Sequence, residues 1–349
     1  MKMLENVKIS DLTTMRIGGK AELVVEVFDE KDVREAYEVA YERRLPAFVV
    51  GNGSNLIGRD EGFRGVIIKN EIGANFHCTT DGAKRQYLPD ENGVFDVPSG
   101  VVMDEFIHAV AAEGWSGMEA MAKIPGTIGA APVQNAGAYG QEIKDVLMSV
   151  RVYDVAKREF REISADECKL GYRRSIFNSG DDVYRYFITS VKVRLSREKL
   201  VPPFYNSLQK YLDENKITDF SPLKIYDAVA AVRSSKLPDV ATEASAGSFF
   251  KNLNVNNEEK ARLRGIGVEV WDESDGGKNT VPSGWLIENT GLKGKEFFGF
   301  VVSEKAALIL INKNARSYAD LEKARNAISE AVFAKYGVRL EQEPVEIKV

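Results

Sequence analysis

The pattern of residues 23–69 constrains the fold more than any other stretch of the chain. Leu23 to Phe28 is an apolar run typical of a buried strand. Asp29 can cap a helix that follows it. The buried face of that helix is expected at Val33, Ala36, Tyr37 and Ala40. Two more apolar runs, at 46–50 and 65–69, predict the strands that close a β-α-β unit.

Strands and helices continue to alternate downstream. Periodicity predicts helices over 104–113, from Leu223 to about Pro238 and over 318–336. Strands are expected at 150–154, at 187–195, at 307–312 and in a last segment ending at Val349. Two stretches are less regular: we expect an exposed hairpin or insertion at 73–92 and a long excursion at 196–222.

The apolar run 46–50 ends in small polar residues, Gly51-Asn52-Gly53-Ser54-Asn55. Glycine lets backbone N–H groups approach a ligand and adopt positive φ, and Ser and Asn side chains extend such an anion site. The usual phosphate fingerprints, G-x-G-x-x-G after a strand and G-x-x-x-x-G-K-[ST], do not occur. Taken alone, the stretch is therefore either a phosphate-binding loop or an ordinary turn.

A second glycine-rich stretch covers residues 124–140 and reads IPGTIGAAPVQNAGAYG. Its residues are small and nearly all uncharged, so its backbone can approach another surface closely. It is either a tightly packed structural crossover or backbone that lies against a large flat cofactor. Its composition alone leaves these two interpretations open.

Composition and charge exclude several classes of protein. The 349 residues, 44% hydrophobic and 28% charged, describe an ordinary globular chain long enough for two or three domains. A net charge of -5 gives no general attraction to nucleic acids or anionic membranes. The N-terminus lacks the apolar core of a secretion signal, and no run of about 18 apolar residues occurs. We therefore expect a cytoplasmic protein that does not insert into membranes.

The cysteines and histidines predict neither a disulfide framework nor a metal site. Cys78 and Cys168 are far apart and lack CxxC spacing, so both are interpreted as incidental. His77 and His108 lack partners at metal-ligand spacing. Structural or surface roles are expected for both histidines.

Together the short motifs of this chain resemble those of the UDP-N-acetylenolpyruvoylglucosamine reductases of bacterial cell-wall synthesis. The first two are Val50 to Leu56 and the 124–140 stretch. Further motifs follow in order: Gly171 to Phe177, Ser235 to Pro238, Ala246 to Asn252, Gly284 to Glu288, Leu292 to Gly294 and Leu340 to Glu343. Each motif is short, but their order and spacing together are specific. The resemblance runs from Thr14 nearly to the C-terminus.

The resemblance implies a fold and a division into domains. The fold would be α+β, a two-subdomain FAD-binding fold of the vanillyl-alcohol-oxidase type with a smaller α+β substrate-binding domain. The first FAD-binding subdomain would cover 1–70, the second 71–238 and 317–349, and the substrate-binding domain 239–316. The chain is expected to be a monomer.

The resemblance also implies an FAD site. The loop around Gly51, Asn52, Gly53, Ser54, Asn55 and Leu56 would wrap the diphosphate. The second stretch would lie along the flavin and its ribityl chain, through Pro125, Gly126, Gly129, Asn135, Gly137, Ala138 and Tyr139. Arg233 would add a cation. Both histidines lie outside the matching motifs, so a covalent flavin bond is not expected and FAD should dissociate.

The implied reaction is NADPH-dependent reduction of an enolpyruvyl ether through FAD. Hydride delivered to the terminal CH2 leaves enolate charge on the carboxylate, which Arg173 can hold through two hydrogen bonds. Ser248 would protonate the adjacent carbon, helped by nearby cations because a serine hydroxyl is a weak acid. Glu343 matches the remaining catalytic acid. Glu341 lies two residues away on the same expected strand face, so its role stays ambiguous.

A diphosphate-bearing nucleotide-sugar substrate needs a second anion site. By resemblance, Lys236 and Tyr205 would contact its diphosphate, and Tyr172 and Asn252 would line its pocket. Tyr205 falls in the 196–222 excursion, which corresponds to a loop that marks one subgroup and could close over the substrate. The chain departs from the family pattern at Leu253, where proline is common, and at Pro344, because the family more often has proline before that glutamate.

Two other functions stay open on fold likeness alone. A sugar or lactone oxidase on a related flavin fold would use O2 and would lack the combination of Arg173, Ser248 and Glu343. A non-catalytic nucleotide-binding protein would keep the glycine-rich stretches and need none of the three. The presence of all three residue types at matching positions favours the reductase.

Overall fold

A computed structural model describes residues 1–74, 89–198, 200–202, 204–274 and 278–348 of the chain. The chain divides into two compact units. The first unit comprises Met1–Glu5, Leu23–Asn52 and Arg64–Ser235. The second comprises Asn6–Glu22, Gly53–Phe63 and Lys236–Val349. The three-domain division expected from the sequence stays a prediction.

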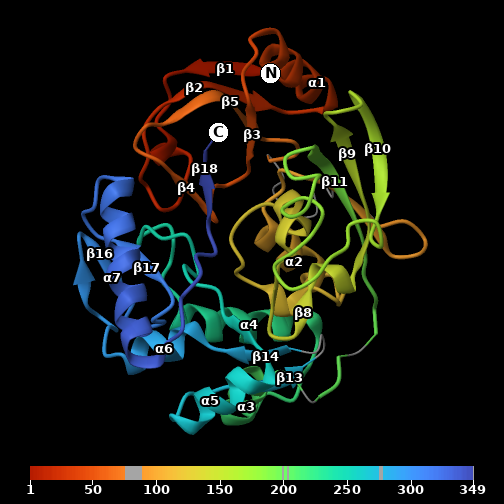
Figure 1. Cartoon of the computed structure of the whole chain (residues 1–349). Coiled ribbons are helices and arrows are strands. Elements are labelled where there is room, and N and C mark those ends of the chain that lie inside the picture. Colours follow the sequence, from red (N-terminus) through yellow and green to blue (C-terminus); the bar gives the residue numbers. More distant parts are fainter. Residues whose placement is uncertain (75–88, 199, 203, 275–277, 349) are drawn as a thin grey trace. The chain divides into compact units, whose positions relative to one another are not determined.

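The predicted β-α-β unit forms the start of the first unit (Figure 1). Its sheet has the strand order β1-β2-β5-β3. The strands are β1 (Lys2–Glu5), β2 (Ala21–Val27), β3 (Ala47–Val50) and β5 (Phe63–Asn70). Helix α1 (Glu30–Glu42) joins β2 to β3, and β3 pairs in parallel with β5. The predictions for this region are confirmed.

Local signals account for the position of α1. The Asp29 carboxylate accepts a hydrogen bond from the Asp32 N–H at 2.8 Å, which caps the helix. Its predicted apolar face is buried against β2 and β5, through Val33, Ala36, Tyr37 and Ala40. Propensity, cap and hydrophobic period thus agree, and this agreement explains why the helix was predictable.

The second sheet of the first unit is antiparallel, with the order β10-β9-β11-β6. Its strands are β6 (Val94–Pro98), β9 (Leu147–Asp154), β10 (Glu159–Ser164) and β11 (Tyr186–Arg194). A large core packs this sheet against α2 (Met103–Ala112), α3 (Asn206–Glu214) and α4 (Pro222–Lys236). The predicted strands at 150–154 and 187–195 and the predicted helices at 104–113 and 223–238 are confirmed, whereas β6 and β10 were not predicted.

The 196–222 stretch is more ordered than expected, because α3 lies within it. Leu208 and Leu212, one helical turn apart, are buried in the core of the first unit. Most of the 73–92 stretch lies outside the described residues, so the predicted hairpin there is not described.

The described residues of the second unit form three small sheets around a core of their own. One has the order β12-β14-β13, with β12 (Leu253–Val255), β13 (Trp271–Ser274) and β14 (Lys278–Val281). Another joins β15 (Glu296–Phe297), β16 (Phe300–Val302) and β17 (Leu310–Asn312). The helices are α5 (Asn257–Gly265), α6 (Ser283–Asn289) and α7 (Tyr318–Tyr336). The first residues of the predicted strand 307–312 form a turn, because the Ile309 N–H bonds the Ala306 carbonyl.

The third sheet joins segments far apart in the sequence. Strand β4 (Leu56–Gly58) pairs in parallel with β18 (Val345–Ile347). In Figure 1, the blue C-terminal strand runs beside the β4 segment that follows the first glycine-rich loop. This pairing fixes the end of that loop.

Among the described residues, no helix combines the length and apolar character that crossing a bilayer requires. Within the same ranges, no three His, Cys, Asp or Glu side chains gather as a metal ion would need. Cys168 is buried, and burial raises the pKa of its thiol to about 12, so it stays protonated at neutral pH. His108 packs edge-on against the Tyr226 ring. Cys78 and His77 lie outside the described residues.

Candidate active site

The glycines of the first loop are required by packing within the protein. A Cβ on Gly53 would lie 1.9 Å from the Leu12 carbonyl oxygen, and Gly53 has a φ of +66°. A Cβ on Gly51 would lie 2.9 Å from the Thr127 Oγ1. The glycines therefore do not by themselves separate a phosphate loop from an ordinary turn. Asn52 is exposed, while Ser54 and Asn55 are half-buried.

The same packing brings the two glycine-rich stretches together, because Thr127 belongs to the second one. The backbone of that stretch is bonded along the loop between β6 and α2. Ile128 N–H donates to the Val101 carbonyl at 2.8 Å, and Gly129 N–H donates to the Ser99 carbonyl at 2.9 Å. Further backbone bonds hold a short hairpin of β7 (Gly137–Ala138) and β8 (Gln141–Glu142). Within the first unit, the stretch is thus both a packed crossover and a neighbour of the first loop.

Asn135 holds the second stretch in place through its side chain. The residue is fully buried and left-handed, with a φ of 48°. Its Nδ2 donates to the Glu142 carboxylate at 2.9 Å and to the Gly171 carbonyl at 3.2 Å. Its Oδ1 accepts from the Lys144 N–H at 3.2 Å. Its amide is therefore used within the protein, and only its backbone is left to face a cofactor.

Arg173 lies at the tip of a tight turn that Asn135 supports. Gly171 and Arg174 exchange backbone hydrogen bonds at 2.9 and 3.1 Å, and Arg173 is left-handed with a φ of 52°. The Ser175 hydroxyl anchors the other side of the turn to the Val133 carbonyl at 2.6 Å. The Arg173 guanidinium lies 5.3 Å from the centre of the Tyr172 ring, and that ring is 47% exposed. Two side-chain bonds thus connect the Arg173 turn to the second glycine-rich stretch.

Arg233, on the last turns of α4, is the second cation of this region. Its Nη2 donates to the Lys123 carbonyl at 3.4 Å, whereas its buried Nε has no hydrogen-bond partner among the described residues. The pKa of Arg233 lies below its usual value, mainly because burial disfavours the charged form and also because Arg173 is nearby. Tyr139 and Asp104 oppose that shift. The Arg233 Nε–H is thus a buried donor on a charged group that is without a protein acceptor among the described residues. Such a group suits an anionic ligand, so the residues around Arg233 fit a phosphate-bearing cofactor.

Asp104 is a residue of this site that sequence reasoning missed. Its Oδ1 accepts from the Lys123 N–H at 2.6 Å and from the Tyr226 hydroxyl at 2.9 Å. Its Oδ2 pairs with the Lys123 ammonium at 3.2 Å. Asp104 therefore holds Lys123 in place, and the Lys123 carbonyl accepts the hydrogen bond from Arg233. No local signal marks it, because a carboxylate in the first turn of α2 is ordinary helix chemistry.

Two of the three predicted site tyrosines of the first unit lie against each other. The rings of Tyr139 and Tyr205 meet edge to face at 5.7 Å. Burial raises the pKa of the Tyr139 hydroxyl, Arg233 opposes this shift, and Tyr205 adds to it. Tyr205 directly precedes α3 and is 49% exposed. Tyr205, predicted to bind substrate, is thus next to a residue predicted to bind the cofactor.

In the second unit, the segments that carry Ser248 and Glu343 are paired. Glu343 N–H donates to the Phe249 carbonyl at 2.9 Å, and Lys251 N–H donates to the Glu341 carbonyl at 2.9 Å. Phe249 and Phe250 are fully buried, which anchors the pairing. Ser248 therefore lies one residue from the backbone contact of Glu343. Arg173 belongs to the first unit and this pair to the second.

Burial distinguishes the two candidate glutamates, because Glu343 is half-buried whereas Glu341 is exposed. Gln342 lies between them and bonds Arg325 of α7 at 2.9 Å, so its side chain points toward that helix. Neighbouring residues of an extended segment point to opposite sides, which directs both glutamates away from α7. The geometry favours Glu343 as the enclosed carboxylate.

The remaining predicted substrate residues are also in the second unit. Asn252 is half-buried, and its Oδ1 accepts from the Ser283 N–H at 3.2 Å, at the start of α6. Lys236 is exposed at the end of α4. Asn252 is therefore held by α6, and the Lys236 ammonium is accessible to a ligand.

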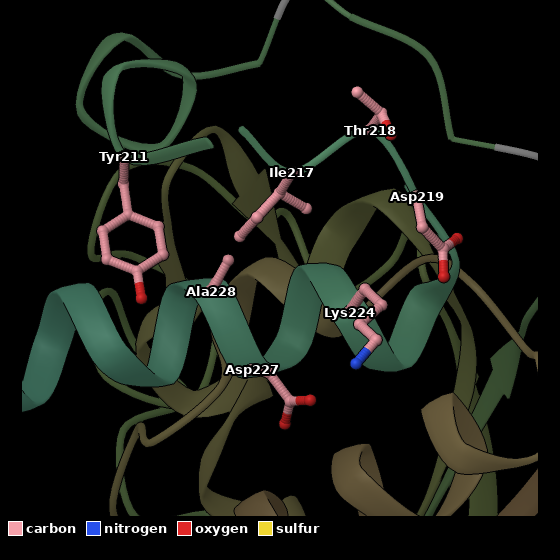
Figure 2. A pocket seen from close by; sticks show the side chains of 7 residues that line it. All are labelled: Tyr211, Ile217, Thr218, Asp219, Lys224, Asp227 and Ala228. Atoms are coloured by element: carbon pink, nitrogen blue, oxygen red, sulfur yellow. The ribbon is translucent and has the colours of Figure 1, made fainter. Parts of the chain in front are cut away.

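A cavity of about 330 Å³ lies in the first unit. Figure 2 shows Tyr211 of α3 and Ile217 of the following loop facing Ala228 of α4. Asp219, Lys224 and Asp227 bring charge of both signs to its lining. None of the predicted cofactor, substrate or catalytic residues lines this cavity, so we do not assign it to the candidate site.

Two family models match the chain. A model described as the C-terminal domain of UDP-N-acetylenolpyruvoylglucosamine reductase matches residues 239–347. A model described as an FAD binding domain matches residues 21–164. The two matched segments contain Ser248, Glu343, the first glycine-rich loop and the second stretch.

Curated relatives match over nearly the whole length. The UDP-N-acetylenolpyruvoylglucosamine reductase of Pseudomonas putida is 35% identical over 345 residues, covering 97% of each chain. That of Ralstonia nicotianae is 35% identical and covers 96% of each chain. A crystal structure of the UDP-N-acetylenolpyruvylglucosamine reductase of Thermus caldophilus has a TM-score of 0.66 at 23% identity, covering 99% of this chain and 98% of that one. This last likeness supports the predicted fold.

Proposed function

The chain belongs to the UDP-N-acetylenolpyruvoylglucosamine reductase family, and from this premise we propose the reaction it catalyses. It is an FAD-dependent oxidoreductase that reduces UDP-N-acetylglucosamine enolpyruvate to UDP-N-acetylmuramate with NADPH, a step in peptidoglycan precursor synthesis. The single observation that carries the mechanism is the backbone pairing of Phe249 with Glu343, because it brings a predicted proton donor and a predicted acid into one segment pair.

When bound, FAD would supply the redox chemistry, which is hydride transfer from NADPH to the enolpyruvyl CH2. The residues proposed to hold FAD come from both glycine-rich stretches and α4. They are Gly51, Asn52, Gly53, Ser54, Asn55, Leu56, Pro125, Gly126, Gly129, Asn135, Gly137, Ala138, Tyr139 and Arg233. The unused Arg233 Nε supports this assignment, and Asn135 acts through its backbone.

Arg173 binds the substrate carboxylate and stabilises the enolate charge that develops on it. Its turn is held from both sides by Asn135 and Ser175, which supports a fixed guanidinium position. A guanidinium suits this task because it stays charged and offers a bidentate hydrogen-bond pattern. Arg174, whose Nε bonds the Ser179 hydroxyl, has a local role instead.

Ser248 donates the proton to the carbon beside the carboxylate. Its half-buried position next to the anchored Phe249 supports a defined hydroxyl direction. Glu343 stabilises the enol form together with Arg173, and its partial burial supports choosing it over Glu341. A carboxyl group near a serine also helps to keep a proton available at that position.

Lys236 and Tyr205 contact the substrate diphosphate, and Tyr172 and Asn252 line the sugar side of the pocket. The exposed Lys236 ammonium and Tyr205 ring are free to meet an incoming ligand. The protein acts in the cytoplasm as a monomer. Its division into 1–70, 71–238 with 317–349, and 239–316 remains part of this proposal.

The alternatives from the sequence are weaker. A flavin-dependent oxidase on a related fold would not be expected to match a reductase C-terminal domain at 239–347. A non-catalytic nucleotide-binding protein would have no use for Arg173, Ser248 and Glu343 together. We therefore retain the reductase.

An anaerobic visible spectrum tests the proposal. The protein is measured as isolated, after NADPH, and after UDP-N-acetylglucosamine enolpyruvate. We expect flavin bands that bleach with NADPH and return with the enolpyruvyl sugar. Absence of a flavin spectrum after supplying FAD would contradict the cofactor assignment, and recovery with oxygen but not with the enolpyruvyl sugar would favour the oxidase.

A further inference from the structure

The Gln342 side chain connects helix α7 to the backbone on the far side of Glu343. Its Oε1 accepts a hydrogen bond from the Arg325 Nη1 at 2.9 Å. Its Nε2 donates to the Pro344 carbonyl at 2.8 Å. These four residues all belong to the second unit. Both ends of one amide are therefore used, and the bond to Pro344 spans the residue proposed as the acid.

Arg325 is itself held in place, so it can orient the Gln342 amide. Its Nη1 also contacts the Glu346 carboxylate at 3.4 Å, and its Nη2 contacts the Glu322 carboxylate of α7 at 3.3 Å. The Tyr318 hydroxyl donates to the same oxygen of Glu346 at 2.6 Å. Glu346 lies on β18, so the Arg325 guanidinium is tied to its own helix and to the C-terminal strand.

The backbone of Glu343 is restrained on both sides. On its N-terminal side, the Glu343 N–H bonds the Phe249 carbonyl, and Gln342 forms a β-bridge with Phe250. On its C-terminal side, Pro344 is buried, and a residue that precedes proline is confined to extended conformations. The Gln342 amide adds a hydrogen bond to the C-terminal side, which the bond to Phe249 does not reach.

We propose that Gln342, oriented by Arg325, is a positioning residue that fixes the Glu343 carboxyl group for the reaction. This inference rests on the proposed function, in which Glu343 stabilises the enol form. A displacement of about 1 Å can slow a reaction by about 100-fold, so a residue that holds the backbone of an acid contributes to the rate without touching substrate. The bonds from Arg325 to Gln342 and from Gln342 to Pro344 hold the Glu343 segment at a defined place beside α7.

A purely structural role for Gln342 predicts a different result. If its bonds only held the C-terminal segment to α7, their loss would lower the melting temperature without slowing one particular step. S317A is the matched structural control, because the Ser317 hydroxyl caps α7 by accepting from the Asp320 N–H at 3.1 Å. Loss of this cap should lower the melting temperature by about 2–4 °C and leave both half-reactions within about twofold of the wild type.

The experiment follows the two half-reactions of the full-length, FAD-loaded protein by anaerobic stopped-flow absorbance. Q342A removes the amide, and Q342M removes both of its hydrogen bonds while keeping most of the side-chain volume. We expect NADPH to reduce both variants at the wild-type rate, and UDP-N-acetylglucosamine enolpyruvate to reoxidise them about tenfold more slowly. Because Gln342 acts through Glu343, adding Q342A to E343Q should slow reoxidation by no more than about twofold beyond E343Q alone.

Reoxidation of both Gln342 variants at the wild-type rate would overturn the inference. So would a further loss of about tenfold when Q342A is added to E343Q, because independent effects multiply. Equal slowing of reduction and reoxidation would also overturn it, since that result would assign Gln342 to the fold alone. Normal reoxidation of E343Q, or none of the wild type, would instead contradict the proposed function, and the two failures are therefore distinguishable.

Discussion

The backbone N–H of Glu343 donates to the carbonyl of Phe249 at 2.9 Å, although the two residues are far apart in the sequence. This bond ties the C-terminal segment to the residue after Ser248. The buried Phe249 and Phe250 side chains keep the pair in register. The proposed proton donor and the proposed acid are thereby carried by adjoining backbone.

The first prediction concerns Ser248. We expect S248A to lower turnover by about 10²- to 10⁴-fold, because the enolate carbon loses its proton donor. Reduction of the flavin by NADPH should stay normal. Stopped-flow absorbance measures the two half-reactions separately. S10A serves as control, because this half-buried serine is remote in sequence and its hydroxyl bonds the neighbouring Asp11 carboxylate. Normal turnover of S248A would contradict its role.

The two glutamates provide a matched pair. E343Q should reduce the rate of flavin reoxidation by substrate about 100-fold, because the half-buried acid is lost. E341Q should stay within about twofold of the wild type, because that carboxylate is exposed. The reoxidation rate is measured after anaerobic reduction. The reverse order of effects would assign the acid to Glu341.

A similar pair tests the carboxylate site. R173K should lower kcat/KM for the enolpyruvyl substrate about 100-fold, because lysine cannot form the bidentate hydrogen bonds of a guanidinium. R174K should change it little, since Arg174 is exposed and bonds Ser179. Steady-state kinetics at saturating NADPH give both values. Equal effects of the two substitutions would argue against a specific role for Arg173.

Asn135 tests the link between the second glycine-rich stretch and the Arg173 turn. N135A removes the bonds to Glu142, Gly171 and Lys144 and strains a left-handed position, so it should lower the free energy of unfolding by about 2–4 kcal/mol. N135G relieves the strain but not the lost bonds and should be less damaging. Urea denaturation measures both. Wild-type stability in N135A would contradict this account.

A pH dependence of stability is expected from Asp154. Burial alone would raise the pKa of this carboxyl, but hydrogen bonds from Arg185 at 2.8 and 3.0 Å and from the Lys157 N–H, together with the charges of Arg185 and Arg161, lower it overall. A lowered folded-state pKa adds stability above the unfolded value of about 3.9, and this stability is lost as pH falls through the folded value.

Urea denaturation from pH 3 to pH 7 checks this sign. The free energy of unfolding of the wild type should fall on acidification. At neutral pH, that of D154N should be lower than the wild-type value by about 2–3 kcal/mol. Between pH 7 and pH 3 the stability of D154N should fall less steeply than that of the wild type. D182N is the control. The Asp182 carboxylate accepts a hydrogen bond from the Arg185 Nη1 at 2.7 Å and is more exposed than Asp154. If the stability of D154N fell as steeply with decreasing pH as that of the wild type, Asp154 would not be the source of the pH dependence.

The sequence by itself determined the elements whose signals are local. Asp29 was expected to cap α1 and does so, and the apolar period of that helix matches its buried face. Motif order also identified the family, because such motifs are contiguous in the chain. Caps and periodicity depend on residues within a few positions of one another, so they can be recognised without a fold.

Only the tertiary structure decided which distant groups meet. The parallel pairing of β4 with β18, the bond from the Asn135 amide to the Gly171 carbonyl and the burial that separates Glu343 from Glu341 all depend on residues far apart in the chain. Helix α3 was missed because its two buried leucines are recognisable only once the core they contact exists. Hydrogen-bond satisfaction is a property of the folded surroundings, so no local signal marks Thr13 and Ser245 as the residues whose hydroxyls, among the buried hydroxyls of the described residues, have no partner.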